Sequence, residues 1–133
     1  MIAKPAAPRE TAQAQFSNGR GTFEAPVGTL LEEYIKAAYP DRWRTIVAAL
    51  VNHKLSELFN PICSDCTVTP LDVSNRDGMR IFRRSLVFVL VVAAHELFPD
   101  ASIYVDHSLP FGGFFCQVKG RGPLSPEELA RLD

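Results

Sequence analysis

The chain has 133 residues, of which 47% are hydrophobic and 22% are charged, and this composition is typical of a globular protein. The formal net charge of −1 excludes a global attraction to nucleic acid or acidic membrane, so any anion site depends on local clustering of cations. The longest apolar run, Leu86 to Ala94, is too short to span a membrane and indicates a buried helix. Three cysteines without a visible secretory signal predict reduced thiols and a cytoplasmic location.

The first part of the chain predicts a small sheet with one helix, after a disordered tail at residues 1–13 that is rich in Ala and Pro. Thr29 and Glu32 have the spacing of a capping box, which predicts a helix start, and Pro40 ends that helix. The expected elements are strands at 14–16 and 22–24, a helix at 28–39, and strands at 45–52, 55–58 and 66–73. This order predicts an α+β fold with a β-grasp domain at residues 14–74.

A second α+β segment is expected at residues 77–133, after a polar stretch at 74–78 that marks the domain boundary. It begins with a long helix from about Met79 to Leu97, followed by strands near 102–107 and 113–119. Ser125 then has the features of an N-cap, because a proline and two acids follow it. The chain stops soon after this helix start, so we expect a truncated domain or a fragment of a longer protein.

Two groups of motifs resemble modules of threonyl-tRNA synthetases. Residues 28–32, 46–52, 54–58 and 68–72 resemble, in the right order, the TGS domain, which is a β-grasp module. Residues 83–90, 99–101, 112–115 and 124–129 resemble the start of the synthetase editing domain. That domain has an R-H-S-x-x-H-L-L helix, a P-x-A exit, a G-F-Y-Y strand and an L-T-x-E-D-L helix.

Both histidine positions of the editing helix differ in this chain, which has Arg84 and Phe88 there. An i, i+4 histidine pair can bind metal or transfer protons from one helical face. Arginine remains protonated and offers no acceptor, and phenylalanine has no polar group. We therefore expect no catalytic residues and no enzyme activity in this chain.

The phrases D-G-M-R-I-F-R-R-S-L and E-L-F-P-D-A-x-I-x-V-D-H-S-L resemble the N-terminal region of bacterial uridine-kinase-like proteins of the phosphoribulokinase/uridine kinase type. The resemblance implies a parent protein in which both modules precede a P-loop kinase domain. This chain has no G-x-x-x-x-G-K-[ST] motif, so ATP and Mg²⁺ are expected only in such a downstream domain, and this chain is expected to hold no cofactor.

Four arginines form the candidate anion or RNA site, because three of them are spaced i, i+3, i+4 on the long helix and the fourth lies just upstream. These residues are Arg76, Arg80, Arg83 and Arg84. Guanidinium groups match phosphate well. The alternative is a solvated helix face, because charge runs usually serve only to keep a surface soluble.

A second candidate is a small-ligand pocket near the glycine pair of the last hairpin, formed by His107, Ser108, Gly112 and Gly113. Asp106 precedes His107 and Ser108 in the order of a triad, but adjacent strand residues point to alternate faces. A structural turn is the alternative interpretation.

Cys63 and Cys66 have C-x-x-C spacing, but a zinc site needs about four ligands and the chain has no second paired motif. A redox motif would begin a helix, whereas this one precedes a strand. We therefore expect no metal site.

The sequence predicts a non-catalytic accessory or regulatory module that binds RNA, a nucleotide or a partner domain. Two alternatives remain: an editing-like hydrolase that acts on mischarged tRNA, and a pure protein-interaction module with a surface apolar patch.

Overall fold

The computed structural model describes residues 3 and 5–133, which divide into two compact units. The division falls between Phe82 and Arg83, within the long helix α2 (Arg76–Leu97). Within the described residues, no helix is both long enough and apolar enough to cross a membrane.

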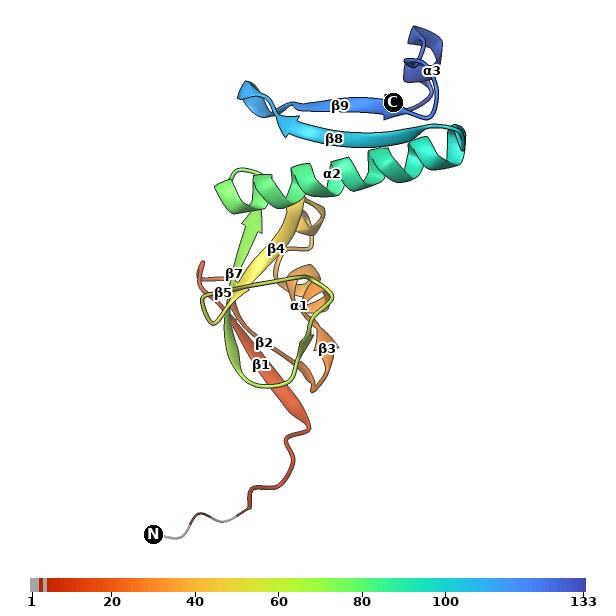
Figure 1. The fold of residues 1–133 in the computed structure, drawn as a ribbon. Coiled ribbons are helices and arrows are strands. Elements are labelled where there is room, and N and C mark those ends of the chain that lie inside the picture. The colour runs from red at the N-terminus through yellow and green to blue at the C-terminus, as the bar shows by residue number, and fades with distance from the viewer. Residues whose placement is uncertain (1–2, 4) are drawn as a thin grey trace. The chain divides into compact units, whose positions relative to one another are not determined.

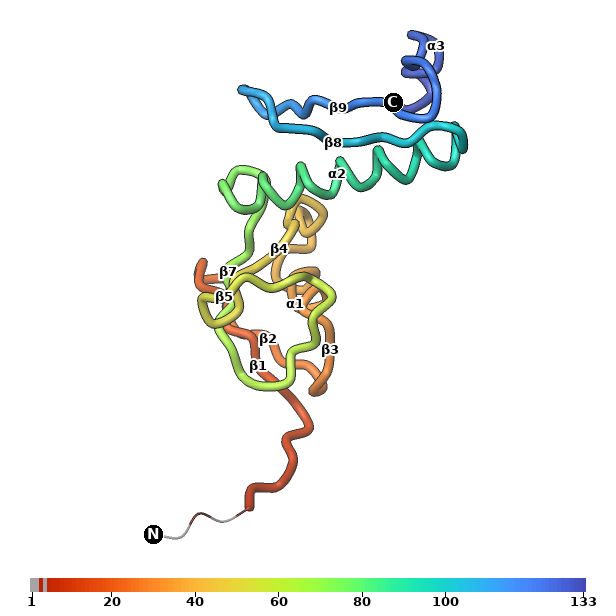
Figure 2. The backbone as a smooth tube through the Cα atoms, viewed as in Figure 1, coloured from red at the N-terminus to blue at the C-terminus, as the bar shows by residue number. Residues whose placement is uncertain are grey.

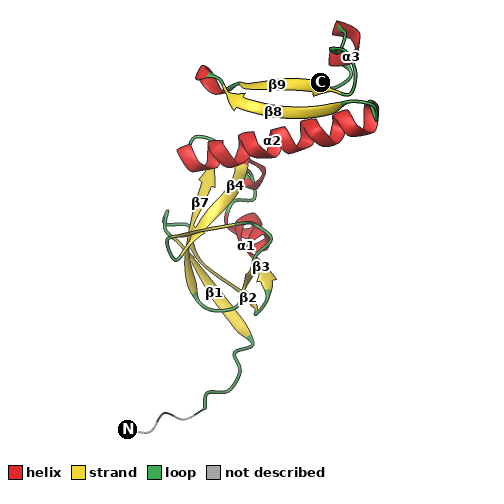
Figure 3. Cartoon of the chain, in the orientation of Figure 1, coloured by secondary structure: helices red, strands yellow, loops and turns green. Residues whose placement is uncertain are grey.

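The first unit is built on a five-stranded sheet in the order β2-β1-β7-β4-β5, with helix α1 packed on it (Figures 1 and 3). Strands β1 and β7 are parallel, and the other neighbours are antiparallel. The elements are β1 (Thr11–Phe16), β2 (Gly21–Pro26), α1 (Leu31–Ala38), β4 (Ile46–Val51), β5 (Lys54–Ser56) and β7 (Cys66–Asp72). This arrangement confirms the predicted α+β class and its β-grasp domain.

The core of this unit lies between α1 and one face of the sheet. Alternate residues of β1 are buried, namely Ala12, Ala14 and Phe16, as expected for a strand with one covered face. From the helix, the buried residues are Leu31, Tyr34, Ile35 and Ala38, which form a single stripe. Small residues on β1 let α1 approach closely, and the Tyr34 hydroxyl donates to the Ala12 carbonyl oxygen at 2.9 Å.

Strand β1 begins at Thr11, three residues before the predicted start at residue 14. Thr11, Ala12 and Gln13 pair with residues 24–26 of β2, which is also longer than predicted. Ala12 is fully buried, so this stretch is part of the core rather than a disordered tail. Residues 5–10 have no regular secondary structure, and residues 1, 2 and 4 of the predicted tail lie outside the described residues.

The predicted capping box of the first helix is wrong. Thr29 belongs to β3 (Thr29–Leu30), which pairs with β6 (Pro61–Ile62), and its hydroxyl donates to the Pro26 carbonyl oxygen. The first-turn amides of α1 instead donate to carbonyl oxygens of residues 58 and 60 at 2.9 Å. A neighbouring loop therefore satisfies the groups that a capping side chain would otherwise bind.

Helix α2 starts three residues before the predicted Met79, because Asn75 provides its N-cap. The Asn75 Oδ1 atom accepts from the amides of Asp77 at 2.9 Å and Gly78 at 3.3 Å. A Cβ atom at Gly78 would lie 2.9 Å from the Asp72 carbonyl carbon, so this position needs glycine for the turn between β7 and α2.

The second unit contains the rest of α2, a hairpin of β8 (Ser102–Ser108) and β9 (Phe114–Lys119), and the short helix α3 (Pro126–Ala130). Figure 2 traces the backbone from α2 into this hairpin. Ser125 and Glu128 form a complete capping box, which confirms the predicted helix start. Among its described residues, only Ala94, Phe98 and Ala101 are buried hydrophobic residues, so the unit has a thin core.

We expect Tyr34→Phe to lower the free energy of unfolding by about 1–2 kcal/mol, because it leaves the Ala12 carbonyl without its buried donor. Urea denaturation followed by circular dichroism measures this change. Tyr104→Phe is the matched control, because Tyr104 is 51% exposed and should lose little stability. Equal effects of the two substitutions would contradict the assigned role of the Tyr34 hydroxyl.

Asp72 should make the stability depend on pH. Hydrogen bonds from the Ser74 side chain and amide, with Arg42 nearby, lower the pKa of the Asp72 carboxyl below its ordinary value of 3.8. A carboxyl with a lowered folded-state pKa stabilises the protein fully above the unfolded-state value, and this contribution is lost as pH falls through the folded-state value. Asp72→Asn should therefore be destabilising at pH 7, and the difference from wild type should shrink below about pH 4. Urea denaturation at several pH values measures it, and a difference that grows on acidification would refute it.

Candidate functional site

Three of the four predicted anion-site arginines lie exposed along α2. Arg76 and Arg84 are exposed and form no ion pair within the described part of the chain. Arg80 Nη1 lies 3.8 Å from Asp77 Oδ1, but both side chains are more than 60% exposed, so this pair is weak. Their spacing of four residues suits one helical face.

The fourth arginine, Arg83, is half-buried and turns toward the hairpin instead. Its guanidinium group lies against Gly112, where a Cβ atom would be 2.6 Å from the Arg83 Cζ atom. Gly112 also has a φ of +92°, a backbone conformation that favours glycine. Arg83 and Gly112, which the sequence predicts for two different sites, therefore lie together.

Arg83 and Gly112 are part of the lining of a cavity of about 350 Å³ between α2 and the hairpin. Apolar side chains from both elements provide most of the remaining wall. The lining residues are Arg83, Leu86, Val87, Leu90, Gly112, Phe114 and Cys116. The cavity thus combines one cationic group with a hydrocarbon surface.

The other residues of the predicted ligand pocket do not line this cavity. His107 is exposed, stacks on the Phe115 ring with centroids 5.1 Å apart, and has Nδ1 3.4 Å from Asp106 Oδ2. Ser108 ends β8 and is exposed, as is Gly113. The structure therefore does not bring His107, Ser108 and Gly113 together with Gly112 around one cavity, and ligand binding by them remains a prediction.

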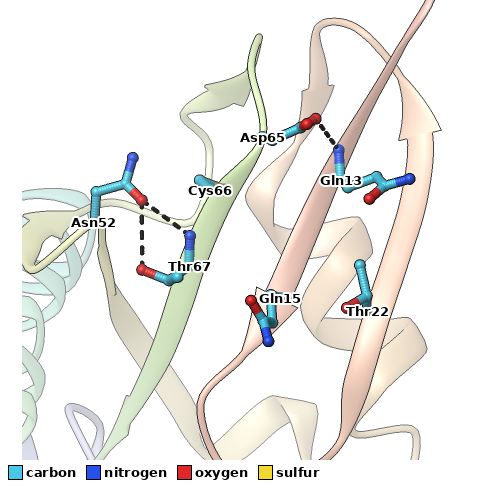
Figure 4. A pocket seen from close by; sticks show the side chains of 7 residues that line it. All are labelled: Gln13, Gln15, Thr22, Asn52, Asp65, Cys66 and Thr67. Carbon is cyan, nitrogen blue, oxygen red and sulfur yellow. Dashed lines mark hydrogen bonds between the residues drawn. The ribbon is translucent and has the colours of Figure 1, made fainter.

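The first unit has a polar groove of about 300 Å³ that sequence reasoning missed (Figure 4). It is lined by Gln13, Gln15, Thr22, Asn52, Asp65, Cys66 and Thr67. Asn52 Oδ1 accepts from the Thr67 amide at 2.9 Å, and Asp65 Oδ1 accepts from the Gln13 amide at 3.0 Å. The Arg9 side chain at 2.6 Å lowers the pKa of the Asp65 carboxyl, with a smaller contribution from the Gln13 amide. Asn52 and Asp65 thus connect loops to strands of the sheet, and this structural role accounts for their positions.

A second cationic surface in the same unit surrounds Trp43 and the buried Tyr39. Arg44 and Lys36 lie over the Trp43 ring, and Arg20 and Arg42 lie over the Tyr39 ring, all within about 5 Å of the ring centroids. Glu32 and Glu33 pair with Lys36 at 2.8 and 2.9 Å, so part of this positive charge is already neutralised. The sequence signal for this surface was the tryptophan between two arginines.

Arg84 and Phe88, the positions where the resembled editing helix has histidines, both face solvent. Arg84 is exposed and Phe88 is 70% exposed. Phe88 therefore does not extend the packed side of α2. Neither side chain can transfer a proton at neutral pH.

The C-x-x-C cysteines have different environments. Cys63 is exposed, whereas Cys66 is buried in the core of the first unit, and all three cysteines are free. Burial raises the pKa of the Cys66 thiol, and the nearby Asp65 charge raises it further. Among the described residues, no group of three His, Cys, Asp or Glu side chains could hold a metal ion.

Comparison with known proteins gives a consistent result. The chain is 31% identical over 90 residues to a threonine–tRNA ligase of Streptomyces griseus and 30% identical over 90 residues to that of Thermobifida fusca. It is 28% identical over 110 residues to the threonine–tRNA ligase of Desulforamulus reducens. These alignments cover 68%, 68% and 83% of this chain. No protein-family model matches it.

The fold and these similarities define the class as a module of the aminoacyl-tRNA synthetase type. More particularly, the chain is homologous to the N-terminal region of threonyl-tRNA synthetases. It spans only 14% to 17% of the length of these three relatives. None of the three is a kinase, so the similarity supports the synthetase part of the predicted resemblance and not the kinase part.

We expect the two C-x-x-C cysteines to differ strongly in reactivity. Maleimide should modify Cys63 of the native protein within minutes and Cys66 only after unfolding, because Cys66 is buried and its pKa is raised. Peptide mass spectrometry after timed labelling measures the two rates, and labelling in urea provides the control. Similar native rates for both thiols would contradict the burial of Cys66.

Proposed function

We propose that this chain is a non-catalytic accessory module of the synthetase type that binds RNA through the exposed arginines of α2. The observation that supports this proposal is the segregation of charge. Helix α2 contains four arginines and only two acids, Asp77 and Glu96, although the whole chain has a net charge of −1. The remainder of the chain therefore carries excess negative charge, whereas α2 itself has a net positive charge.

Arginine suits this role because its guanidinium group can form two parallel hydrogen bonds to phosphate oxygens. Arg76 and Arg84 have no competing acid partner within the described residues, and the weak Asp77 contact leaves Arg80 accessible. Phosphate contacts of this kind give affinity without sequence specificity and respond strongly to salt. A regulatory module that accompanies a catalytic domain could act in this way.

The absence of catalysis is part of the proposal. Arg84 and Phe88 replace the two histidines of the resembled editing helix, and their exposed positions offer no general base. The competing function is an editing-like hydrolase. We expect no deacylation of mischarged threonine-specific tRNA by this chain, and measurable turnover would establish the hydrolase instead.

The uridine-kinase-like parent is a separate element of the proposal. If this proposal is right, the same reading frame also encodes a P-loop domain that uses ATP and Mg²⁺. Sequencing the native transcript tests this. We also propose a cytoplasmic location, because all three cysteines are free thiols. Nucleotide binding by this chain is the less favoured form of anion binding.

A protein-interaction module is the second candidate, because α2 also exposes apolar side chains. Leu86, Phe88 and Val89 are 51%, 70% and 59% exposed. Large exposed apolar side chains can contribute to a protein contact. Such a module would bind no RNA at low salt.

We expect the triple variant Arg76→Glu, Arg80→Glu, Arg84→Glu to bind single-stranded RNA and tRNA at least about 10-fold more weakly than wild type at low salt. Fluorescence anisotropy at several salt concentrations measures the affinity, and the variant should also show a shallower salt dependence. The control is Arg20→Glu, Arg44→Glu, which reverses charge on the cationic surface of the first unit. The proposal would be refuted if the wild-type chain bound no RNA, or if the triple variant bound RNA as tightly as wild type.

A further inference from the structure

We propose that the cavity between α2 and the β8–β9 hairpin binds a small carboxylic acid with a short hydrocarbon chain. The Arg83 guanidinium group would receive the carboxylate, and the hydrocarbon would lie against Leu86, Leu90 and Phe114. This inference does not depend on RNA binding, because Arg83 is the arginine of α2 that is turned away from the exposed set.

The cavity has a suitable size and composition for such a ligand. Its volume of about 350 Å³ lies at the lower end of the range for small-molecule sites, which typically combine apolar walls with a few polar groups. Four of the seven lining residues have apolar side chains: Leu86, Val87, Leu90 and Phe114. All the lining residues belong to the second unit, so the cavity is formed by one compact part of the chain.

Arg83 supplies an unmatched positive charge at this cavity. It is half-buried, and within the described residues it makes neither a hydrogen bond nor an ion pair. Removing a guanidinium group from water without a partner costs free energy, and a bound anion would recover that cost. The planar fork of arginine matches the two oxygens of a carboxylate.

Gly112 determines where that charge lies. With a φ of +92°, it brings its backbone against the guanidinium group, and a Cβ atom would lie 3.1 Å from the Arg83 Nε atom and closer still to Cζ. Glycine at this position therefore leaves the space that Arg83 occupies. A substitution here should displace the guanidinium group while leaving the arginine in the chain.

The walls of the cavity favour a carboxylate over a phosphate. A phosphate group carries more charge and additional oxygen atoms, but among the described lining residues Arg83 alone is charged. The remaining phosphate oxygens would face leucine and phenylalanine side chains without hydrogen bonds, which is unfavourable. The Cys116 thiol is a weak donor and adds no positive charge.

Isothermal titration calorimetry of the full chain with 3-methylbutanoate tests the proposal directly. We expect saturable binding with one site. The neutral isostere 3-methylbutanamide should bind at least about 10-fold more weakly, which corresponds to about 1.4 kcal/mol. Inorganic phosphate should not compete.

Adjacent arginines provide the matched variants. Arg83→Met should abolish the binding of 3-methylbutanoate, whereas Arg84→Met should leave it unchanged, because Arg84 does not line the cavity. Arg83→Lys should weaken binding while keeping the charge, since lysine lacks the planar fork. Gly112→Ala should weaken it by displacing Arg83. Circular dichroism and amide NMR spectra show whether each variant is folded.

Four results would overturn the proposal: no saturable binding to the folded wild type, equal binding of acid and amide, equal loss in Arg83→Met and Arg84→Met, or competition by phosphate. The RNA assay keeps this inference separate from the proposed function. Arg83→Met should retain most RNA binding, whereas the exposed-arginine triple variant should retain carboxylate binding, because none of its three positions lines the cavity.

Discussion

The parallel pairing of β1 with β7 is the constraint on which the first unit depends. It joins residues 14–16 of the β1–β2 hairpin to residues 66–68 of β7, and β7 pairs on its other side with the β4–β5 hairpin. Because the two strands are far apart in the chain, their pairing requires the intervening helix to cross over the sheet and cover one face. The small residues Ala12 and Ala14 make that close packing possible. The position of Asp72, where β7 ends and the turn into α2 begins, follows from the same pairing.

The second unit has a different physical character. Its two-stranded hairpin and partial helix bury few large side chains, so its core cannot be filled as tightly as that of the first unit. An arginine therefore occupies a position facing the hairpin where an apolar residue would ordinarily pack. The open space beside Arg83 is the result, and it is the basis for a ligand site that a denser core would have excluded.

The two units suggest a division between scaffold and recognition. The first unit has a full hydrophobic core and a polar groove in which Asn52 and Asp65 bind backbone amides of the sheet. Helix α2 carries a concentration of positive charge that the net charge of the chain conceals. Its arginines have two distinct environments, because the helical repeat exposes Arg84 and directs its neighbour Arg83 toward the hairpin. Two adjacent residues therefore differ in role: Arg84 lies on the surface, whereas Arg83 lines the cavity.

Local patterns in the sequence were sufficient for the α+β class, the order of the main strands and the long helix. The Ser125 capping box depends on neighbouring residues only, and a linear pattern expresses such an interaction directly. The apolar run from Leu86 to Ala94 predicted a helix correctly but its burial wrongly, because Leu86, Phe88 and Val89 are exposed. The start of β1, the capping of α1 and the partner of Arg83 were decided by tertiary structure. Each of these depends on a segment distant in the chain: β2 for Thr11, the loop near Asn60 for α1, and Gly112 for Arg83. Spacing identified both arginine and glycine as candidates, but only the folded hairpin placed them together.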